Sequence, residues 1–298
     1  MTASPRSRIY LMLLLVMLLW AGNALIARAI RADIPPFTLA FLRWLGAALL
    51  LLPFSARGIL TEWPVMRRHW PMLILLAIFG VGCFNALLYS GLRSSSATNA
   101  LLIQAAIPAL VLGCNFLFFR TRALTLQIVG VLVAALGAML IIFRADLRAL
   151  ATLSFGQGDA LILLGVLCWS IYTSLLRKRP PLTATTFLTL SFLVGVLIMA
   201  PLAASEWPVH PVRWTPAVAG GIVYVAIFPS IIAYFLYNHA VAQIGAAQAG
   251  QVISLQPLLG ALLAALLLGE PLHSYHFAGM ALILLGIAAA SRSNHTAQ

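Results

Sequence analysis

Residues 97–119 read ATNALLIQAAIPALVLGCNFLFF, and residues 246–268, which lie 149 positions later, read AAQAGQVISLQPLLGALLAALLL. Each stretch is long enough to cross a lipid bilayer, which requires about 20 mostly apolar residues in an α-helix. Each also carries a proline at the same place, Pro108 in the first and Pro257 in the second. Either stretch alone predicts a membrane-spanning helix, and the pair predicts a duplicated chain.

The composition of the whole chain indicates a membrane protein. Of its 298 residues, 62% are hydrophobic and only 8% are charged, and the mean hydropathy is +1.03. A soluble domain carries about 25% charged residues because its surface faces water. A chain this poor in charge must cover much of its surface with lipid instead.

Ten runs are long and apolar enough to span a membrane. They are residues 9–28, 36–54, 71–92, 97–119, 124–143, 159–177, 185–204, 216–238, 245–268 and 273–290. Pro36, Pro71 and Pro216 mark the predicted starts of the second, third and eighth runs, because proline is tolerated in the first turn of a helix. The predicted fold class is therefore an all-α polytopic membrane protein with ten transmembrane helices.

The formal net charge of +12 does not indicate a nucleic-acid partner. The basic residues are scattered in small groups between apolar runs, without a basic stripe. With the N-terminus in the cytoplasm, eleven Lys and Arg residues fall on the cytoplasmic side and six on the other. Because basic residues concentrate on the cytoplasmic side of membrane proteins, we expect both termini there.

No metal or cofactor is expected. The three cysteines, Cys83, Cys114 and Cys168, lie inside apolar runs and lack the spacing of metal ligands.

An offset of 149 residues aligns further residues of special conformation or size. The matches are Trp20 with Trp169, Gly46 with Gly195, Ala97 with Ala246, Gly130 with Gly279, and Gly137 with Gly286. We therefore predict two repeats, residues 1–149 and 150–298, each with five helices. Because five is odd, the second repeat must be inverted relative to the first. Inverted repeats of this kind are typical of transporters, whose substrate site lies near the midplane.

The matched residues have physical roles that suit such a fold. Pro108 and Pro257 lie inside predicted helices, where each removes a backbone hydrogen bond and kinks the helix, as a hinge or as a simple bend. The carbonyl that is freed must be buried in protein or face a polar cavity. The two matched glycine pairs are each seven residues apart within one helix, a stripe that favours close helix packing.

Polar and aromatic side chains inside the predicted spans are the candidates for substrate binding, because contact with lipid is unfavourable for most of them. The candidates are Trp20, Asn23, Arg43, Asn85, Tyr89, Asn99, Gln104, Trp169, Tyr172, Tyr234, Gln248, Gln251 and Ser254. The last three share one helix face, or nearly so. Such a set suits a zwitterionic or moderately apolar solute. The alternative is hydrogen bonding between helices, worth about 0.6 kcal/mol per contact.

Two kinds of candidate have a second interpretation. Arg43 lies about 10 Å along its helix from Pro36, where it could bind a substrate carboxylate, pair with helix-end carbonyls or extend to the nearer surface. Trp20 and Trp169 could belong to the aromatic belt at the membrane surface, but they lie well inside their runs. The belt is better filled by Tyr10, Trp63, Trp70, Trp207 and Trp214.

The positions of the acidic residues limit which energy source could drive transport. All six fall at predicted helix ends or in loops, and no histidine lies in the middle of a predicted helix. A proton relay at the midplane is therefore not expected. The sequence also lacks a P-loop, and nothing in it indicates an ATPase subunit as a partner. Facilitated export, exchange, or transport weakly coupled through polar backbone groups remains.

An intramembrane enzyme is the alternative from a different class. Residues Gly156-Gln157-Gly158-Asp159 spell GxGD, a signature of intramembrane aspartyl proteases. That chemistry requires two carboxylates that share a proton, and no second aspartate lies inside a neighbouring predicted helix. Asp159 is better placed to start a helix, and the sequence contains neither HExxH nor GxSxG. We therefore expect that the chain is not an enzyme.

Several motifs taken together resemble the EamA repeat of the drug/metabolite transporter superfamily. They are Leu19-Trp20-Ala21-Gly22-Asn23, Phe41-Leu42-Arg43, and Gln256-Pro257 followed by Gly269-Glu270-Pro271 and Gly279. The resemblance covers nearly the whole chain as two copies of five helices. Arg120-Thr121 stands in the first half where the family has Gly-Glu, which argues against an essential carboxylate at both positions.

The resemblance implies a function. It implies export of amino acids or related metabolites across the cytoplasmic (inner) membrane of bacteria, through a cavity lined by helices 1, 3, 4, 6, 8 and 9. We expect alternating access, with a small-molecule substrate and the lipid bilayer as the partners, and amino acids with aromatic or apolar side chains as the favoured substrates. A drug or sugar-derivative exporter of the same fold is the alternative.

Overall fold

The computed structural model describes residues 5–95, 97–146, 155–268 and 271–292. In this part of the chain the regular elements are all helical, and ten helices are long and apolar enough to cross a membrane, which confirms the predicted fold class. The predicted repeat boundary at residues 149–150 lies outside the described residues, as do Gly269 and Glu270.

Several spans consist of more than one helical segment. The first half contains α1 (Pro5–Ala29), α2 (Pro36–Thr61), α3 (Trp63–Ala77), η1 (Ile78–Cys83), α4 (Phe84–Leu92), α5 (Ala97–Gln104), α6 (Ile107–Phe119) and α7 (Thr125–Ile142). The second half contains α9 (Gln157–Leu175), η2 (Leu176–Lys178), α10 (Ala184–Glu206), α11 (Pro216–Ala226), η3 (Ile227–Ile232), α12 (Ala233–Ile244), α13 (Ala246–Val252), η4 (Ile253–Leu255), α14 (Gln256–Leu268) and α15 (Ser274–Arg292).

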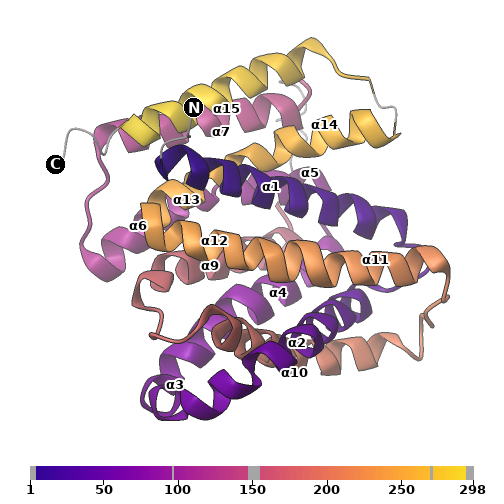
Figure 1. Ribbon diagram of the computed structural model, residues 1–298. Helices are drawn as coiled ribbons and strands as arrows, with labels where there is room; N and C mark the ends of the chain where they lie inside the picture. Colours follow the sequence, from indigo (N-terminus) through magenta and orange to yellow (C-terminus); the bar gives the residue numbers. More distant parts are fainter. Residues whose placement is uncertain (1–4, 96, 147–154, 269–270, 293–298) are drawn as a thin grey trace.

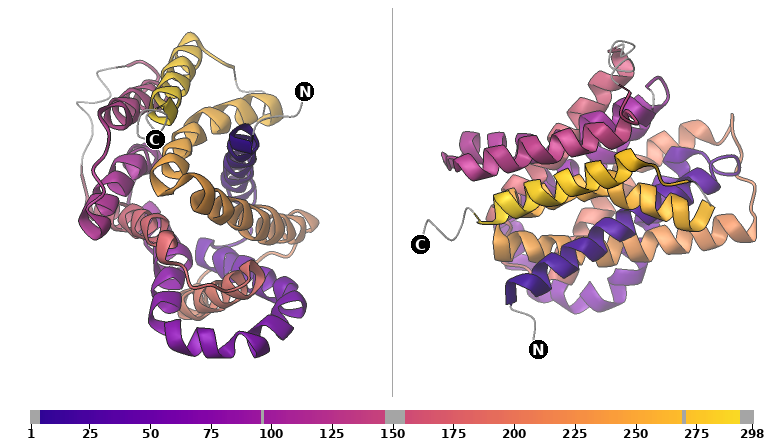
Figure 2. Two further views of the ribbon diagram at one scale, coloured as in Figure 1. Left: turned by 60° about the vertical axis from the view of Figure 1, so that its left-hand side comes forward. Right: turned by 90° about the horizontal axis from the view of Figure 1, so that it is seen from above.

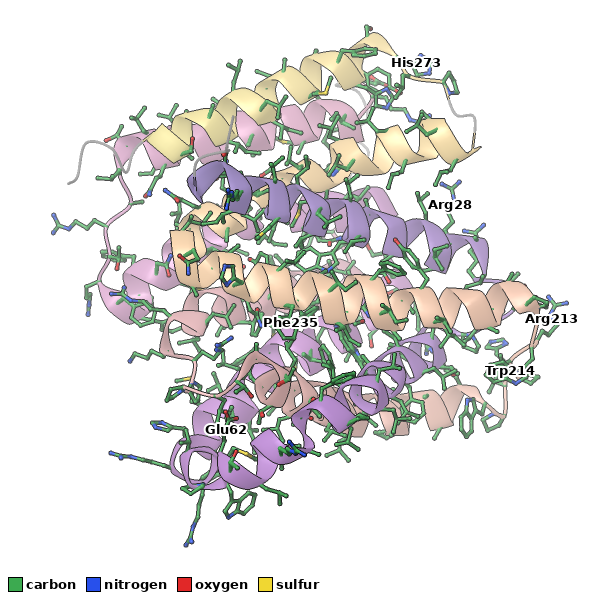
Figure 3. The ribbon with its side chains drawn as sticks, in the orientation of Figure 1. Arg28, Glu62, Arg213, Trp214, Phe235 and His273 are labelled. Carbon is green, nitrogen blue, oxygen red and sulfur yellow. The ribbon has the colours of Figure 1, made fainter. Side chains whose placement is uncertain are left out.

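The helices run roughly side by side and give the bundle two distinct ends (Figure 1). We call the end where α1 begins and α15 finishes the proximal end, and the opposite end the distal end. Figure 3 shows Arg28, Arg213, Trp214 and His273 at the distal end, and Glu62 toward the proximal end. Seen nearly along the helices, α7 and α15 pair at one edge, and α2, α3 and α10 lie at the opposite edge (Figure 2, left).

Three boundaries differ by several residues from the predicted ones. The second run was predicted to end at residue 54, but α2 continues to Thr61 and α3 begins at Trp63 rather than Pro71. The polar residues after position 54 end the apolar run without ending the helix. Pro71 instead follows a kink at His69, where φ is −115°. Likewise α12 continues past the predicted residue 238, so that the exposed His239 lies inside the helix, toward the proximal end.

Two π-helical segments interrupt the third and eighth spans at repeat-related positions. Segments η1 and η3 both begin and end 149 residues apart. A π segment disturbs the regular hydrogen-bond ladder of the helix, and here side chains of the opposite half bond to backbone carbonyls. The Gly80 carbonyl accepts a hydrogen bond from Tyr234 Oη at 2.8 Å. Its repeat counterpart, the Pro229 carbonyl, accepts one from Trp20 Nε1 at 3.1 Å. The two halves are thus joined reciprocally through these segments.

The fourth and ninth spans break beside the two matched prolines. In the first half α5 ends at Gln104 and α6 begins at Ile107; in the second half the short η4 separates α13 from α14. Pro108 and Pro257 are each the second residue of the helix that follows, where the missing N–H costs nothing. Discontinuous helices at the repeat interface are typical of transporter sites. A hinge role for the two prolines stays a prediction.

The predicted glycine stripes bring α7 and α15 together. A Cβ on Gly137 would lie 2.6 Å from the Gly279 carbonyl oxygen and 2.9 Å from the Ile283 backbone nitrogen. Gly130 faces the Gly286 carbonyl in the same way. Because the obstructing atoms belong to the backbone of α15, they cannot rotate away as a side chain could.

We expect Gly137→Leu to destabilise the protein. Overpacking costs about 1–3 kcal/mol, so the apparent Tm of the purified protein in detergent should fall by roughly 5–10 °C. The matched control is Gly113→Leu, because a Cβ on the exposed Gly113 meets no atom within 4 Å. The control should change Tm by less than a third as much. Equal shifts for the two variants would contradict close packing along this stripe.

Candidate functional site

An aromatic cluster occupies the middle of the bundle. Its members are Trp20 of α1, Trp44 of α2, Phe84 of α4, Trp169 and Tyr172 of α9, Phe192 of α10, and Tyr234 and Tyr237 of α12. Trp169 is the centre, with ring centroids 5.2–5.8 Å from those of five other members. Edge-to-face and tilted pairs at such distances are favourable. The cluster joins helices of both halves.

The repeat-related tryptophans meet inside this cluster. Trp20 and Trp169 contact each other edge to face, with centroids 5.3 Å apart. Trp169 is only 3% exposed, so the aromatic-belt interpretation does not fit it. The other predicted belt tryptophans, Trp63, Trp70, Trp207 and Trp214, are more than half exposed.

Arg43 of α2 is buried beside the cluster, with 5% of its surface exposed. Its Nε donates a hydrogen bond to Ser230 Oγ at 2.6 Å, and its Nη2 donates one to the Pro229 carbonyl at 3.4 Å. The guanidinium carbon lies 4.3 Å from the centre of the Trp44 ring. Arg43 therefore does not extend to the surface; it bonds to a carbonyl of the π segment η3 rather than to a helix end.

All partners of Arg43 are electrically neutral. Among the described residues, the ion pairs join Arg93 to Glu206 and Arg213 to Asp33, and none includes Arg43. Burying an unpaired charge is costly unless a counter-charge or several hydrogen bonds compensate it. Within the described part of the chain, the site thus contains a buried cation without a carboxylate partner.

The predicted amides and hydroxyls do not form one facing set. Asn85 Nδ2 donates to the Val81 carbonyl of the preceding segment η1, and Gln104 Nε2 donates to the Ala100 carbonyl of its own helix. Gln248 and Ser254 are buried on α13 and η4, whereas Asn23 and Tyr89 are half-buried on α1 and α4. Tyr89 packs against the main hydrophobic core.

Gln251 and Tyr172 each take part in a hydrogen bond that involves an amide group, and in each amide one buried atom has no partner among the described residues. Gln251 Nε2 donates to the Gly130 carbonyl of α7 at 3.1 Å, and its buried Oε1 has no partner among the described residues. Tyr172 Oη donates to Asn238 Oδ1 at 2.7 Å, which leaves the buried Asn238 Nδ2 without a described partner.

Asn99 lies in a different place, at the distal end. Asp159 caps the start of α9 by accepting a hydrogen bond from the Gly156 N–H at 2.7 Å, as expected of a helix-start residue. Its other oxygen accepts bonds from Ser95 Oγ and from Asn99 Nδ2, the latter at 3.0 Å. Asn99 therefore links α5 to α9.

Glu206 forms a second distal junction. It accepts bonds from the Thr38 N–H at 2.9 Å, from Thr38 Oγ1 at 3.2 Å and from Arg93 Nη2 at 2.7 Å. Asp159 and Glu206 thus each accept several hydrogen bonds. Within the described residues no second carboxylate contacts Asp159, which is not the arrangement of a protease dyad. No group of three His, Cys, Asp or Glu side chains among these residues could hold a metal ion.

The residues of the site that the sequence analysis missed include Trp44, Phe84, Phe192 and Ser230. Trp44 directly follows Arg43, but its burial depends on α10, whose Phe192 stacks on it with centroids 5.1 Å apart. Ser230 follows Pro229 in the eighth run, where a small hydroxyl residue carries little signal by itself. Only the π segment turns it toward Arg43.

Comparison with known proteins agrees with this architecture. A solved structure superposes with a TM-score of 0.79 at 20% identity, covering 98% of this chain and 99% of the other, which shows a shared fold. The uncharacterized transporter YyaM of Bacillus subtilis is 27% identical over 83% of this chain and 80% of its own length. An uncharacterized transporter of Archaeoglobus fulgidus is 26% identical over 97% of this chain and 99% of its own.

The family profile matches the chain twice. The profile of the EamA-like transporter family matches residues 7–143 and again residues 156–292. The two matches begin and end 149 residues apart, the offset that also relates the two π segments. The chain belongs to the EamA-like transporter family, and it is a multi-pass membrane transporter.

Proposed function

We propose that the protein exports small carboxylate-bearing metabolites, above all amino acids with aromatic or apolar side chains. The observation that carries this proposal is the buried Arg43, whose hydrogen-bond partners among the described residues are all neutral and which lies against the aromatic cluster. A substrate carboxylate would supply the missing counter-charge, because a guanidinium can donate two parallel hydrogen bonds to it. The rings would contact the substrate side chain.

The same charge argues against two other solute classes. A cationic drug would meet a fixed positive charge in a region of low dielectric, where repulsion is strong. A neutral sugar derivative would leave Arg43 without a counter-ion. An exporter of drugs or sugar derivatives is therefore the less favoured alternative.

Transport in our proposal proceeds by alternating access between the halves. The two halves contact through the aromatic cluster and through the reciprocal bonds at Gly80 and Pro229. Rocking about the breaks beside Pro108 and Pro257 would separate these rings and admit the substrate from one side at a time. The basic residues favour a cytoplasmic proximal end, so that in a bacterial cytoplasmic membrane both termini would lie in the cytoplasm.

We further propose that substrate moves down its own gradient. The described buried carboxylates, Asp159 and Glu206, lie at the distal end of the bundle and are held by several donors. Neither is an isolated acid at mid-membrane, where a proton carrier is usually placed.

Counterflow in proteoliposomes tests the proposal. Purified full-length protein should exchange phenylalanine at least about tenfold faster than phenethylamine, which lacks only the carboxylate, since losing a hydrogen bond to a charged group costs about 1.5–3 kcal/mol. Lysine and a sugar phosphate serve as further comparisons. An imposed pH gradient should change the rate by less than about twofold.

Two outcomes would contradict the proposal. Equal rates for phenylalanine and phenethylamine would exclude carboxylate recognition as its basis. Exchange that occurs only with a pH gradient would exclude the uncoupled mechanism.

A further inference from the structure

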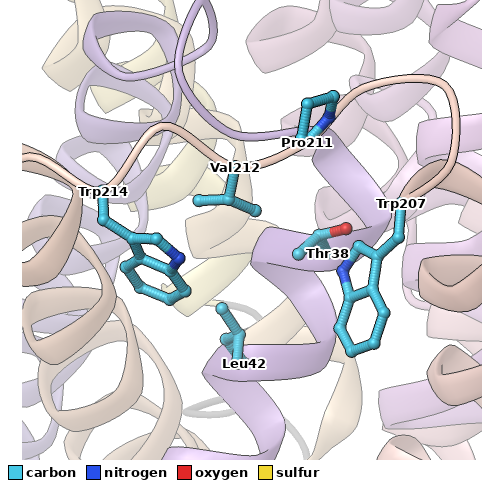
Figure 4. A pocket seen from close by; sticks show the side chains of 6 residues that line it. All are labelled: Thr38, Leu42, Trp207, Pro211, Val212 and Trp214. Carbon is cyan, nitrogen blue, oxygen red and sulfur yellow. The ribbon is translucent and has the colours of Figure 1, made fainter.

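A pocket at the distal end is separate from the aromatic cluster. It encloses about 330 Å³ and is lined by Thr38 and Leu42 of α2 and by Trp207, Pro211, Val212 and Trp214 of the α10–α11 connection. The two indoles stand on opposite sides, with Val212 and Thr38 between them and Leu42 below (Figure 4). The lining is almost entirely apolar.

The walls of this pocket are held in place by polar contacts outside it. Arg213 Nε forms an ion pair with Asp33 at 3.2 Å, and its Nη2 donates to the Ala32 carbonyl at 3.2 Å. The Arg213 N–H donates to the Asp33 carbonyl at 2.8 Å. On the opposite side, Glu206 accepts two hydrogen bonds from Thr38. The connection from α10 to α11 is therefore fastened to the start of α2.

The floor of the pocket continues into the surface that faces lipid. Leu42 and Leu49 are seven residues apart on α2 and so share a helix face, and Leu49 is 58% exposed. Helices α10 and α11 pack on α2 and carry the exposed Leu197 and Val223. Leu42 lies about 9 Å along the helix from Pro36. The pocket thus reaches from the level of the two exposed indoles toward the depth of the acyl chains.

We propose that this pocket is a phospholipid site that takes one acyl chain from the leaflet at the distal end. The chain would lie over Leu42 toward Leu49, with its ester region between the Trp207 and Trp214 indoles, which suit the membrane interface. Because the chain comes from the hydrocarbon of the bilayer and not from water, its binding would rest on van der Waals contact with the apolar lining. The Arg213 charge is already paired with Asp33, so recognition rests on the acyl chain more than on the headgroup.

Native mass spectrometry of the full-length protein in detergent, titrated with phosphatidylglycerol or phosphatidylethanolamine, tests this site. We expect one tightly retained lipid of either headgroup, and at least a roughly tenfold weaker affinity, about 1.4 kcal/mol, in the Trp207→Ala/Trp214→Ala variant. The matched control is Trp63→Ala/Trp70→Ala, which removes two tryptophans of similar exposure on α3 that do not line the pocket. Glycerol phosphate, the headgroup portion alone, should not compete.

A second measurement does not depend on the folding of the alanine variant. The tryptophan fluorescence of the wild-type protein and of the conservative Trp207→Phe/Trp214→Phe variant is compared in nanodiscs that contain acyl-brominated lipid. The difference between the two proteins is the emission of Trp207 and Trp214, and we expect bromine to quench it. Competition by glycerol phosphate, equal loss of lipid in the control variant, or no quenching of that difference would overturn the proposal.

Discussion

Replacing Arg43 with glutamine is expected to lower phenylalanine counterflow at least tenfold. Hydrogen bonds to a charged group contribute about 1.5–3 kcal/mol, which corresponds to roughly 10–150-fold in rate or affinity. Glutamine keeps a donor for Ser230 Oγ or the Pro229 carbonyl but removes the charge and the two-pronged geometry. Arg43→Lys keeps the charge without that geometry and should recover only part of the rate. The measurement is the initial rate of exchange in liposomes.

The substrate comparison separates recognition from structure. Phenylalaninamide, which has no carboxylate, should be exchanged at a low rate that Arg43→Gln does not lower. If Arg43 serves only to hold Ser230 and the Pro229 carbonyl in place, the variant should slow both compounds by the same factor. The matched control is Arg67→Gln, since Arg67 is an exposed arginine of α3. A wild-type rate for phenylalanine in Arg43→Gln would contradict the assignment of the carboxylate site.

The predictable part of the fold is set by properties that act locally or repeat along the chain. Apolar length decides where spans lie, and the matches at one offset, such as Pro108 with Pro257, reveal the repeat. Apolar length did not predict the end of α2, because a helix can continue past the membrane after its apolar run has ended. The π segments were missed altogether. Only Pro229 in the second segment breaks the ladder by itself, and Gly80 does not identify the first.

The candidate site was predictable in its aromatic part and much less so in its amides. Trp20, Trp169, Tyr172 and Tyr234 meet in the core between the two halves, where edge-to-face and tilted ring pairs are favourable. An amide, in contrast, can satisfy its hydrogen bonds with any nearby carbonyl or carboxylate. Asn99, for example, bonds to Asp159 at the distal end. Such choices depend on contacts between residues far apart in sequence, which periodicity does not report.

Removing the Trp169 ring is expected to impair transport more than removing the charge of Asp159. Trp169→Ala deletes the side chain at the centre of five ring contacts. Large-to-small substitution of a buried tryptophan costs about 3–5 kcal/mol, and counterflow per folded molecule should fall at least tenfold because the proposed wall of the substrate path is lost. Trp169→Phe keeps one ring and should give an intermediate rate.

Asp159→Asn provides the contrast in the same helix. The amide oxygen can still accept bonds from Ser95 and Asn99, and only the capping bond from the Gly156 N–H is lost, because the amide nitrogen in its place cannot accept it. An N-cap-type bond is worth about 1 kcal/mol, so the variant should fold and keep at least about a third of the exchange rate, since that bond contributes to stability and not to a coupled proton step.

Both variants, Trp169→Ala and Asp159→Asn, are measured with and without an imposed pH gradient, and the rates are normalised to the amount of monodisperse protein. If Asp159→Asn abolishes an exchange that depends on the gradient, Asp159 is the coupling carboxylate and the uncoupled mechanism is wrong. If Trp169→Ala exchanges substrate at the wild-type rate, the aromatic cluster supports the fold without lining the path.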